Sequence, residues 1–206
     1  MKGFFNLENC FLKFMTKIAD LIILNFLWLF FSLPIITIGA STTALYYVTL
    51  KMADNTEGYI YKSFIKSFKN NFKQATIAWL IFSFSSIILF IDFRYWASFN
   101  SALSYVIVIL TITIWIIYTL VFLVYFPLLA MFDNSLILTL KNSLIISFRN
   151  FFTLIPILLF LCLIIYLTLK IPLAYFIMFI IGFSGFSQIS SYILLNLFNK
   201  YWKYSN

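Results

Sequence analysis

The chain contains no histidine, only two cysteines and only six acidic residues among its 206. The cysteines, Cys10 and Cys162, lie in a terminal segment and in an apolar run, with no spacing typical of metal ligands or of a disulfide framework. Paired carboxylates within the apolar runs and a serine beside a plausible base are also missing, so acid–base and nucleophilic catalysis lack their usual groups. We therefore expect a protein that is not an enzyme and that holds neither a metal nor a cofactor.

Phosphate-binding loops are missing as well. The sequence has no GxxxxGK[ST] motif, so we expect no nucleotide hydrolysis. The net charge is +8, but the basic residues stand at the ends of apolar runs, where they set orientation and meet anionic head groups. This placement favours membrane lipids over nucleic acid as partners.

Apolar residues are abundant instead: 64% of the chain is hydrophobic, 22% is aromatic and the mean hydropathy is +1.03. Such a chain has too little polar surface for a water-soluble protein. We predict an all-α fold, a polytopic membrane helical bundle forming one integral membrane domain over residues 1–206. About six transmembrane helices are expected, at residues 17–33, 35–52, 74–91, 103–132, 152–169 and 173–198. No cleavage site follows the first run, so we expect it to remain as a membrane helix.

The second span, residues 35–52, follows Pro34 and is rich in small residues between Gly39 and Ala44. A single bent helix followed by a re-entrant loop is the alternative. The 18 residues after Pro34 reach roughly 27 Å as a helix, which favours a separate span. The small residues predict close helix packing.

Two polar stretches predict amphipathic helices at the membrane surface, at residues 58–73 and 135–150. In the first, lysines recur on one helical line and aromatic residues on another; in the second, Leu140, Leu144, Phe148 and Phe151 share a face. The candidate partner or lipid interface comprises Tyr61, Lys62, Phe64, Lys66, Phe68, Lys69, Phe72, Lys73, Phe148 and Arg149.

The distribution of basic residues predicts the orientation. Twelve of the 14 lie in the N-terminal segment, between Lys51 and Lys73, in the second amphipathic stretch or at the C-terminus, and only Arg94 and Lys170 lie in the opposite loops. The positive-inside rule then places both termini and both amphipathic helices in the cytoplasm.

Strongly polar residues within the predicted spans mark any solute pathway, since such residues are costly in lipid. The candidates are Asp20, Asn25, Gln188 and Asn196. For each of them, structural hydrogen bonding is favoured over a role in substrate binding.

Two runs carry a family resemblance: LIILNFLWLFFSLPIITIGASTTALYYVTLKM and EGYIYKSFIKSFKNNFKQATIAWLI. They resemble the YesL family of Gram-positive bacterial membrane proteins, with a specific match over residues 4–81. The resemblance implies a small multi-pass protein of the bacterial cell membrane, without assigned catalytic activity, encoded beside carbohydrate importers. We expect a non-catalytic accessory or regulatory subunit that contacts the permease subunits of a sugar ABC importer. The alternative is a small stand-alone or oligomeric transporter or channel for a small solute.

Overall fold

The computed structural model describes the backbone of residues 4–202 and the side chains of residues 11–201. The side chains of Lys2, Cys10 and Lys203, which entered the sequence-based predictions, lie outside this range. The described residues form helices and no strand, which confirms the all-α prediction. The helices are α1 (Phe4–Ser32), a 3-10 turn (Ile35–Thr37), α2 (Ile38–Ala53), α3 (Ile60–Trp96), α4 (Ala102–Met131), α5 (Leu136–Arg149), α6 (Phe151–Lys170), α7 (Pro172–Ile177), a π-helical turn (Met178–Gly182) and α8 (Phe183–Trp202).

Among the described residues, five helical segments are long and apolar enough to cross a membrane. They are the Phe11–Ser32 part of α1, then α3, α4 and α6, and finally the continuous segment Pro172–Tyr201 that joins α7 to α8. The chain is therefore a multi-pass membrane protein, as its composition predicts.

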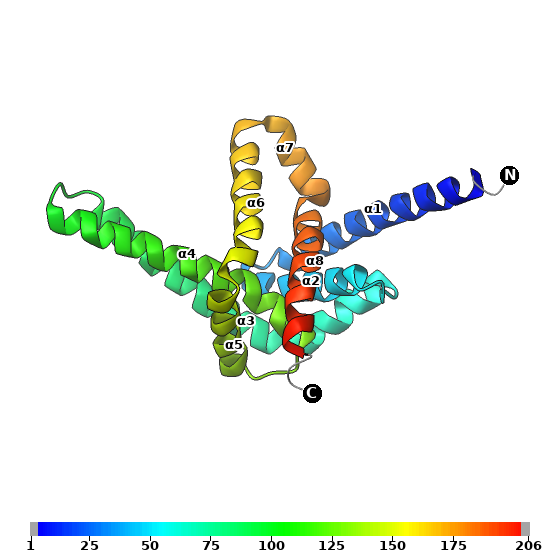
Figure 1. Cartoon of the computed structure of the whole chain (residues 1–206), viewed down its shortest axis with the longest axis horizontal. Helices are drawn as coiled ribbons and strands as arrows, with labels where there is room; N and C mark the ends of the chain where they lie inside the picture. Colours follow the sequence, from blue (N-terminus) through cyan, green and yellow to red (C-terminus); the bar gives the residue numbers. More distant parts are fainter. Residues whose placement is uncertain (1–3, 203–206) are drawn as a thin grey trace.

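Figure 1 shows how these helices are arranged. The hairpin of α3 and α4, the N-terminal part of α1, and the hairpin of α6 and α7 project in three directions from a packed centre. The centre contains α2, α5, the end of α4 and α8. Most side chains on the projecting parts are exposed apolar residues, as expected of surfaces that face lipid.

Two predicted segments differ from the observed helices. The predicted helix 58–73 is not a separate surface helix: residues 60–73 belong to α3, which runs without a break from Ile60 to Trp96. No glycine or proline occurs within that range, so nothing ends the helix where the predicted surface helix meets the predicted span.

The predicted span 35–52 is observed as the 3-10 turn and a helix shorter than predicted; that it crosses the bilayer stays a prediction. Its helix, α2, has 16 residues, which is about 24 Å of helix and short for a hydrocarbon core of about 30 Å. Eleven of those 16 residues are buried by protein. Helix α2 is therefore the central core helix of the fold, and the small residues of its sequence serve that packing.

Helices α2 and α3 share the most extensive helix–helix interface of the described chain. They run antiparallel, since Gly39 lies against Ala75 and Trp79 while Met52, at the other end of α2, packs with Ile60. Residues 60–78 of α3 thus follow α2 along its whole length.

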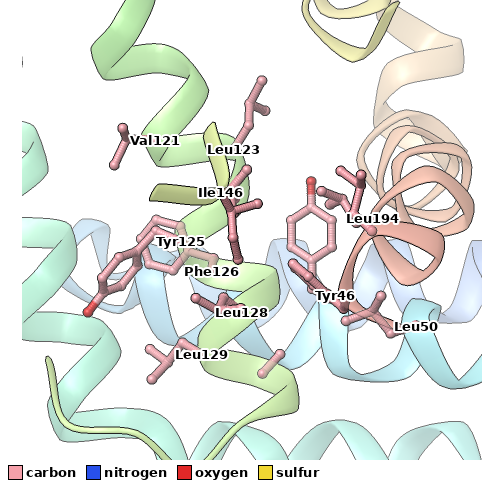
Figure 2. Packing of buried hydrophobic residues seen from close by; sticks show 14 of the residues in the cluster. Tyr46, Leu50, Val121, Leu123, Tyr125, Phe126, Leu128, Leu129, Ile146 and Leu194 are labelled. Atoms are coloured by element: carbon pink, nitrogen blue, oxygen red, sulfur yellow. The ribbon is translucent and has the colours of Figure 1, made fainter. Parts of the chain in front are cut away.

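The central core joins α2 to α4, α5 and α8. Figure 2 shows Tyr46 and Leu50 of α2 near Leu194 of α8, with Phe126 and Leu128 of α4 beside them. These side chains are buried, and their packing holds the three projecting parts together.

Candidate functional site

Helix α3 carries a row of lysines on its exposed side. Lys62, Lys66, Lys69 and Lys73 recur every three or four residues, and all are exposed. We call these residues the basic face. The single continuous helix α3 holds them in register.

The opposite face of α3 is buried. Ile60, Phe64, Ser67, Ala75 and Ala78 point into the protein, and they follow the helical period of three to four residues. This side packs against α2, and it explains why the lysines point outward.

The aromatic residues of the predicted row lie partly on the exposed side of α3 and partly on its buried side. Tyr61 and Phe72 are exposed, Phe68 is half-buried and Phe64 is fully buried. The ring of Phe31 in α1 lies 5.6 Å from that of Phe64 and 4.8 Å from that of Phe68. Phe64 is therefore a core residue and cannot contact a partner, whereas Tyr61 and Phe72 border the basic face.

The basic face lacks counter-charges. Within the described part of the chain, none of its lysines forms an ion pair, and the only polar or aromatic contact is that of Lys62 Nζ, 4.8 Å from the ring centroid of Tyr59. Four neighbouring unpaired cations create a positive potential that attracts acidic surfaces and anionic lipid.

The second predicted amphipathic helix is α5, and its bounds agree with the prediction. Its polarity is the inverse of that of a helix on a soluble protein. Thr139, Ser143 and Ser147 are buried, while Ile137, Phe148 and other apolar side chains are exposed. Small hydroxyl side chains allow α5 to pack closely on its neighbours, and the large apolar side chains face outward, as suits a helix in contact with lipid.

The end of α5 is attached to α8. Asn150 Nδ2 donates to the hydroxyl of Tyr201 at 2.6 Å, and the guanidinium of Arg149 lies 5.7 Å from the Tyr201 ring centroid. Phe148 is 62% exposed. Of the two predicted interface residues on α5, Arg149 has a partner within the protein and Phe148 remains free to contact lipid or another protein.

Asn25 is the centre of a buried hydrogen-bond network between α1 and the π-helical turn. Its Nδ2 donates to the carbonyl of Phe179 at 2.7 Å, and its Oδ1 accepts from the backbone N–H of Ser184 at 3.1 Å. The Ser184 hydroxyl donates to the carbonyl of Leu21 at 2.7 Å. A π turn shifts the backbone hydrogen-bond register and leaves groups such as the Phe179 carbonyl to be satisfied from outside the helix. Asn25 does this, so both ends of its amide have a structural role.

A second network, which the sequence-based predictions missed, joins α2 to α8. Thr49 Oγ1 lies 2.9 Å from Ser187 Oγ and 2.8 Å from Ser191 Oγ. The hydroxyl of Tyr46 lies 3.3 Å from Ser190 Oγ. Ser184, Ser187 and Ser191 stand at i, i+3 and i+7, and this spacing of hydroxyls on one helical face was the available signal.

The other polar candidates do not converge on Asn25. Gln188 is buried and its Oε1 has no hydrogen-bond partner among the described residues, whereas Asn196 is exposed. Asp20 lies partly exposed on α1, more than one turn before Asn25. The structure describes no group of three or more histidine, cysteine or acidic side chains able to hold a metal ion within residues 11–201.

Comparison with known protein families gives a match over part of the chain. Residues 21–93 match a family of membrane proteins described as "Protein of unknown function, DUF624". The matched segment contains the C-terminal part of α1, all of α2 and most of α3, and thus the whole basic face. No curated protein and no solved structure matches the chain.

Proposed function

We propose that the protein is a non-catalytic accessory or regulatory membrane subunit that binds the permease subunits of a carbohydrate ABC importer. The observation that carries this proposal is the basic face of α3. It presents four exposed, unpaired lysines on a helix whose other side is fixed against α2. A rigid charged surface of this kind speeds and orients the encounter with a partner of opposite charge.

The resemblance of residues 4–81 to the YesL family supports the choice of partner, because that family is encoded beside carbohydrate importers. The positive-inside rule predicts that the basic face lies at the cytoplasmic side. The importer's permeases meet their ATPase subunits on that side, so an accessory subunit there is well placed to affect their coupling.

A small stand-alone transporter is the second candidate. Two observations favour it: buried hydroxyls between α2 and α8, and a π turn within a membrane-spanning segment. π turns occur often at functional sites. Against this, both ends of the Asn25 amide already bond to the protein's own backbone.

The test is affinity purification in mild detergent, followed by mass spectrometry of the copurified proteins. We expect permease subunits in the eluate. Charge reversal of Lys62, Lys66 and Lys69 to glutamate should weaken their retention at least about a hundredfold, because each lysine contributes about 1 kcal/mol near an anionic surface.

A matched control carries the same change of net charge elsewhere. Lys13, Lys141 and Lys200 are exposed and lie off the basic face, so their reversal to glutamate should leave the retention close to that of the unmodified protein. Equal loss in both triple variants contradicts docking through the basic face. A protein that purifies alone and moves sugar into liposomes supports the transporter and overturns the proposal.

A further inference from the structure

An apolar hollow of about 350 Å³ lies between α3, α4 and α5. Its size falls in the range of about 300 to 1,000 Å³ that is typical of sites for small molecules. Its walls are formed mainly by Ala, Ile, Leu, Val and Phe side chains, and Ser85, Tyr118 and Tyr125 supply the only hydroxyls.

Two of the three hydroxyls bond to the protein. Ser85 Oγ donates to the carbonyl of Ile81 at 2.8 Å, and the hydroxyl of Tyr118 donates to the carbonyl of Phe82. Tyr125 differs from them: it is fully buried, and its hydroxyl has no partner among the described residues.

Figure 2 shows the Tyr125 hydroxyl pointing away from Tyr46 and Leu194 of the central core. Its ring lies 5.3 Å from that of Phe82, another residue of the hollow's wall. A buried donor without an acceptor destabilises a fold. A water molecule is an unfavourable acceptor here, because apolar hollows stay dry. Tyr125 therefore points to an acceptor that arrives with a bound molecule.

The hollow is accessible from the bilayer. Ile81 of α3 and Ile114 of α4 line it and are 51% and 52% exposed, and both helices are long enough to span the membrane. An acyl chain can enter sideways between them, since the walls and the surrounding lipid are equally apolar.

Polar groups lie near one end of the hollow, outside its lining. Gln74 Nε2 of α3 donates to the carbonyl of Asn134 at 2.7 Å, just before α5 begins at Leu136, which lines the hollow. Lys73, the residue before Gln74, is exposed and unpaired within the described chain. Tyr125 lies six residues before the last residue of α4, about 9 Å along the helix. A cation one residue from Gln74, near this end, and a hydroxyl donor slightly deeper match the phosphate and the ester carbonyl of a phospholipid.

We propose that this hollow binds one acyl chain of an anionic phospholipid, with the ester carbonyl accepting from Tyr125 and the phosphate near Lys73. The site is separate from docking through the basic face, apart from the shared Lys73. Its occupant comes from the bilayer in which the protein resides.

The experiment uses the full chain in detergent, with native mass spectrometry after addition of phosphatidylglycerol or of phosphatidylcholine with the same acyl chains. We expect one retained phosphatidylglycerol per protein and weaker retention of phosphatidylcholine. Ser85→Phe fills the hollow and should abolish retention. Thr113→Phe is the control: Thr113 is exposed on α4, outside the hollow, and its hydroxyl bonds only within its own helix.

Tyr125→Phe keeps the ring and removes the unpaired hydroxyl. We expect it to lower the affinity for phosphatidylglycerol about fivefold, the effect of one lost neutral hydrogen bond. If the hollow is empty, the same substitution removes an unsatisfied group, and it should raise the melting temperature without changing lipid retention. That result, or equal retention in Ser85→Phe and Thr113→Phe, overturns the proposal. Equal affinity for the two lipids overturns the role of Lys73.

Discussion

Replacing Gly39 by alanine tests the central contact of the fold, the antiparallel packing of α2 on α3. A Cβ atom on Gly39 would lie 2.4 Å from the Ala75 carbonyl oxygen and 2.5 Å from Trp79 Cβ. Both atoms belong to, or are bonded directly to, the α3 backbone, so no side-chain rotation relieves the overlap. The two helices must move apart, which costs about 1 to 3 kcal/mol. Alanine's better helix propensity offsets at most about 1 kcal/mol of this cost.

Two overlaps well under 3.0 Å place the cost at about 2 to 3 kcal/mol, so after the gain in propensity we expect Gly39→Ala to lose about 1 to 2 kcal/mol of stability and to lower the melting temperature by about 2 to 8 °C. Gly185→Ala is the matched control, because a Cβ on Gly185 meets no atom within 4 Å. Only the propensity term remains there, so this variant should melt about 2 to 4 °C higher than the unmodified protein. The assay is thermal unfolding followed by circular dichroism in one detergent for all three proteins. A Gly39→Ala protein that melts at or above the unmodified protein refutes the close approach of α2 and α3.

Three further predictions concern the buried networks and the orientation. Asn25→Leu leaves two buried backbone groups of the π-turn region unpaired and should cost about 1 to 3 kcal/mol, measured as a lower melting temperature. Thr49→Val removes the hydroxyl shared by two α8 serines and should cost about 1 kcal/mol, whereas Thr113→Val, which loses only a bond within its own helix, should be nearly neutral. The orientation is tested with single cysteines at Asn55 and at Phe99, in a variant whose native cysteines are replaced. An impermeant maleimide should label the cysteine at position 55 from the cytoplasm and the cysteine at position 99 from outside. Labelling of both from one side contradicts the orientation predicted from the charges.

The sequence predicts the fold class, an all-α membrane protein, and the positions of several helices. Long apolar runs bounded by basic residues predict membrane helices, and α4, α5 and α6 agree with the predicted ranges within a few residues. Capping residues help here: Ser135, at the start of the predicted range 135–150, is the N-cap residue of α5 and accepts from the N–H of Leu138. Such signals are local, so they are visible without knowledge of the packing.

The segment from Pro34 to Trp96 was harder to predict. Hydropathy does not distinguish a helix that faces lipid from one that is covered by other helices, because both are apolar. Residues 35–52 are therefore predicted as an apolar span, and hydropathy alone does not show that α1, α3, α4 and α8 cover this helix. The lysines of residues 62–73 indicate a surface helix, but they show nothing about where that helix ends.

The polar residues also differ in how far the sequence predicts their roles. The exposure of the basic face was predictable, because unpaired lysines avoid burial. The hydrogen bonds of Asn25 were not predictable. Its partners Phe179 and Ser184 are more than 150 residues away, and their backbone groups become available only where α8 follows a π turn. The unpaired hydroxyl of Tyr125 is likewise a property of the assembled α3, α4 and α5.

The sequence by itself determines that this is a helical multi-pass membrane protein with a concentrated row of lysines near its first third. The reason is that composition, the length of apolar runs and charge are properties of each segment by itself. Only the tertiary structure decides that α2 is a core helix, that the lysine row continues into a spanning helix, and that a hollow remains between α3, α4 and α5. These features depend on which apolar surfaces meet, and surfaces of equal hydropathy become distinct only through the shapes that pack against them.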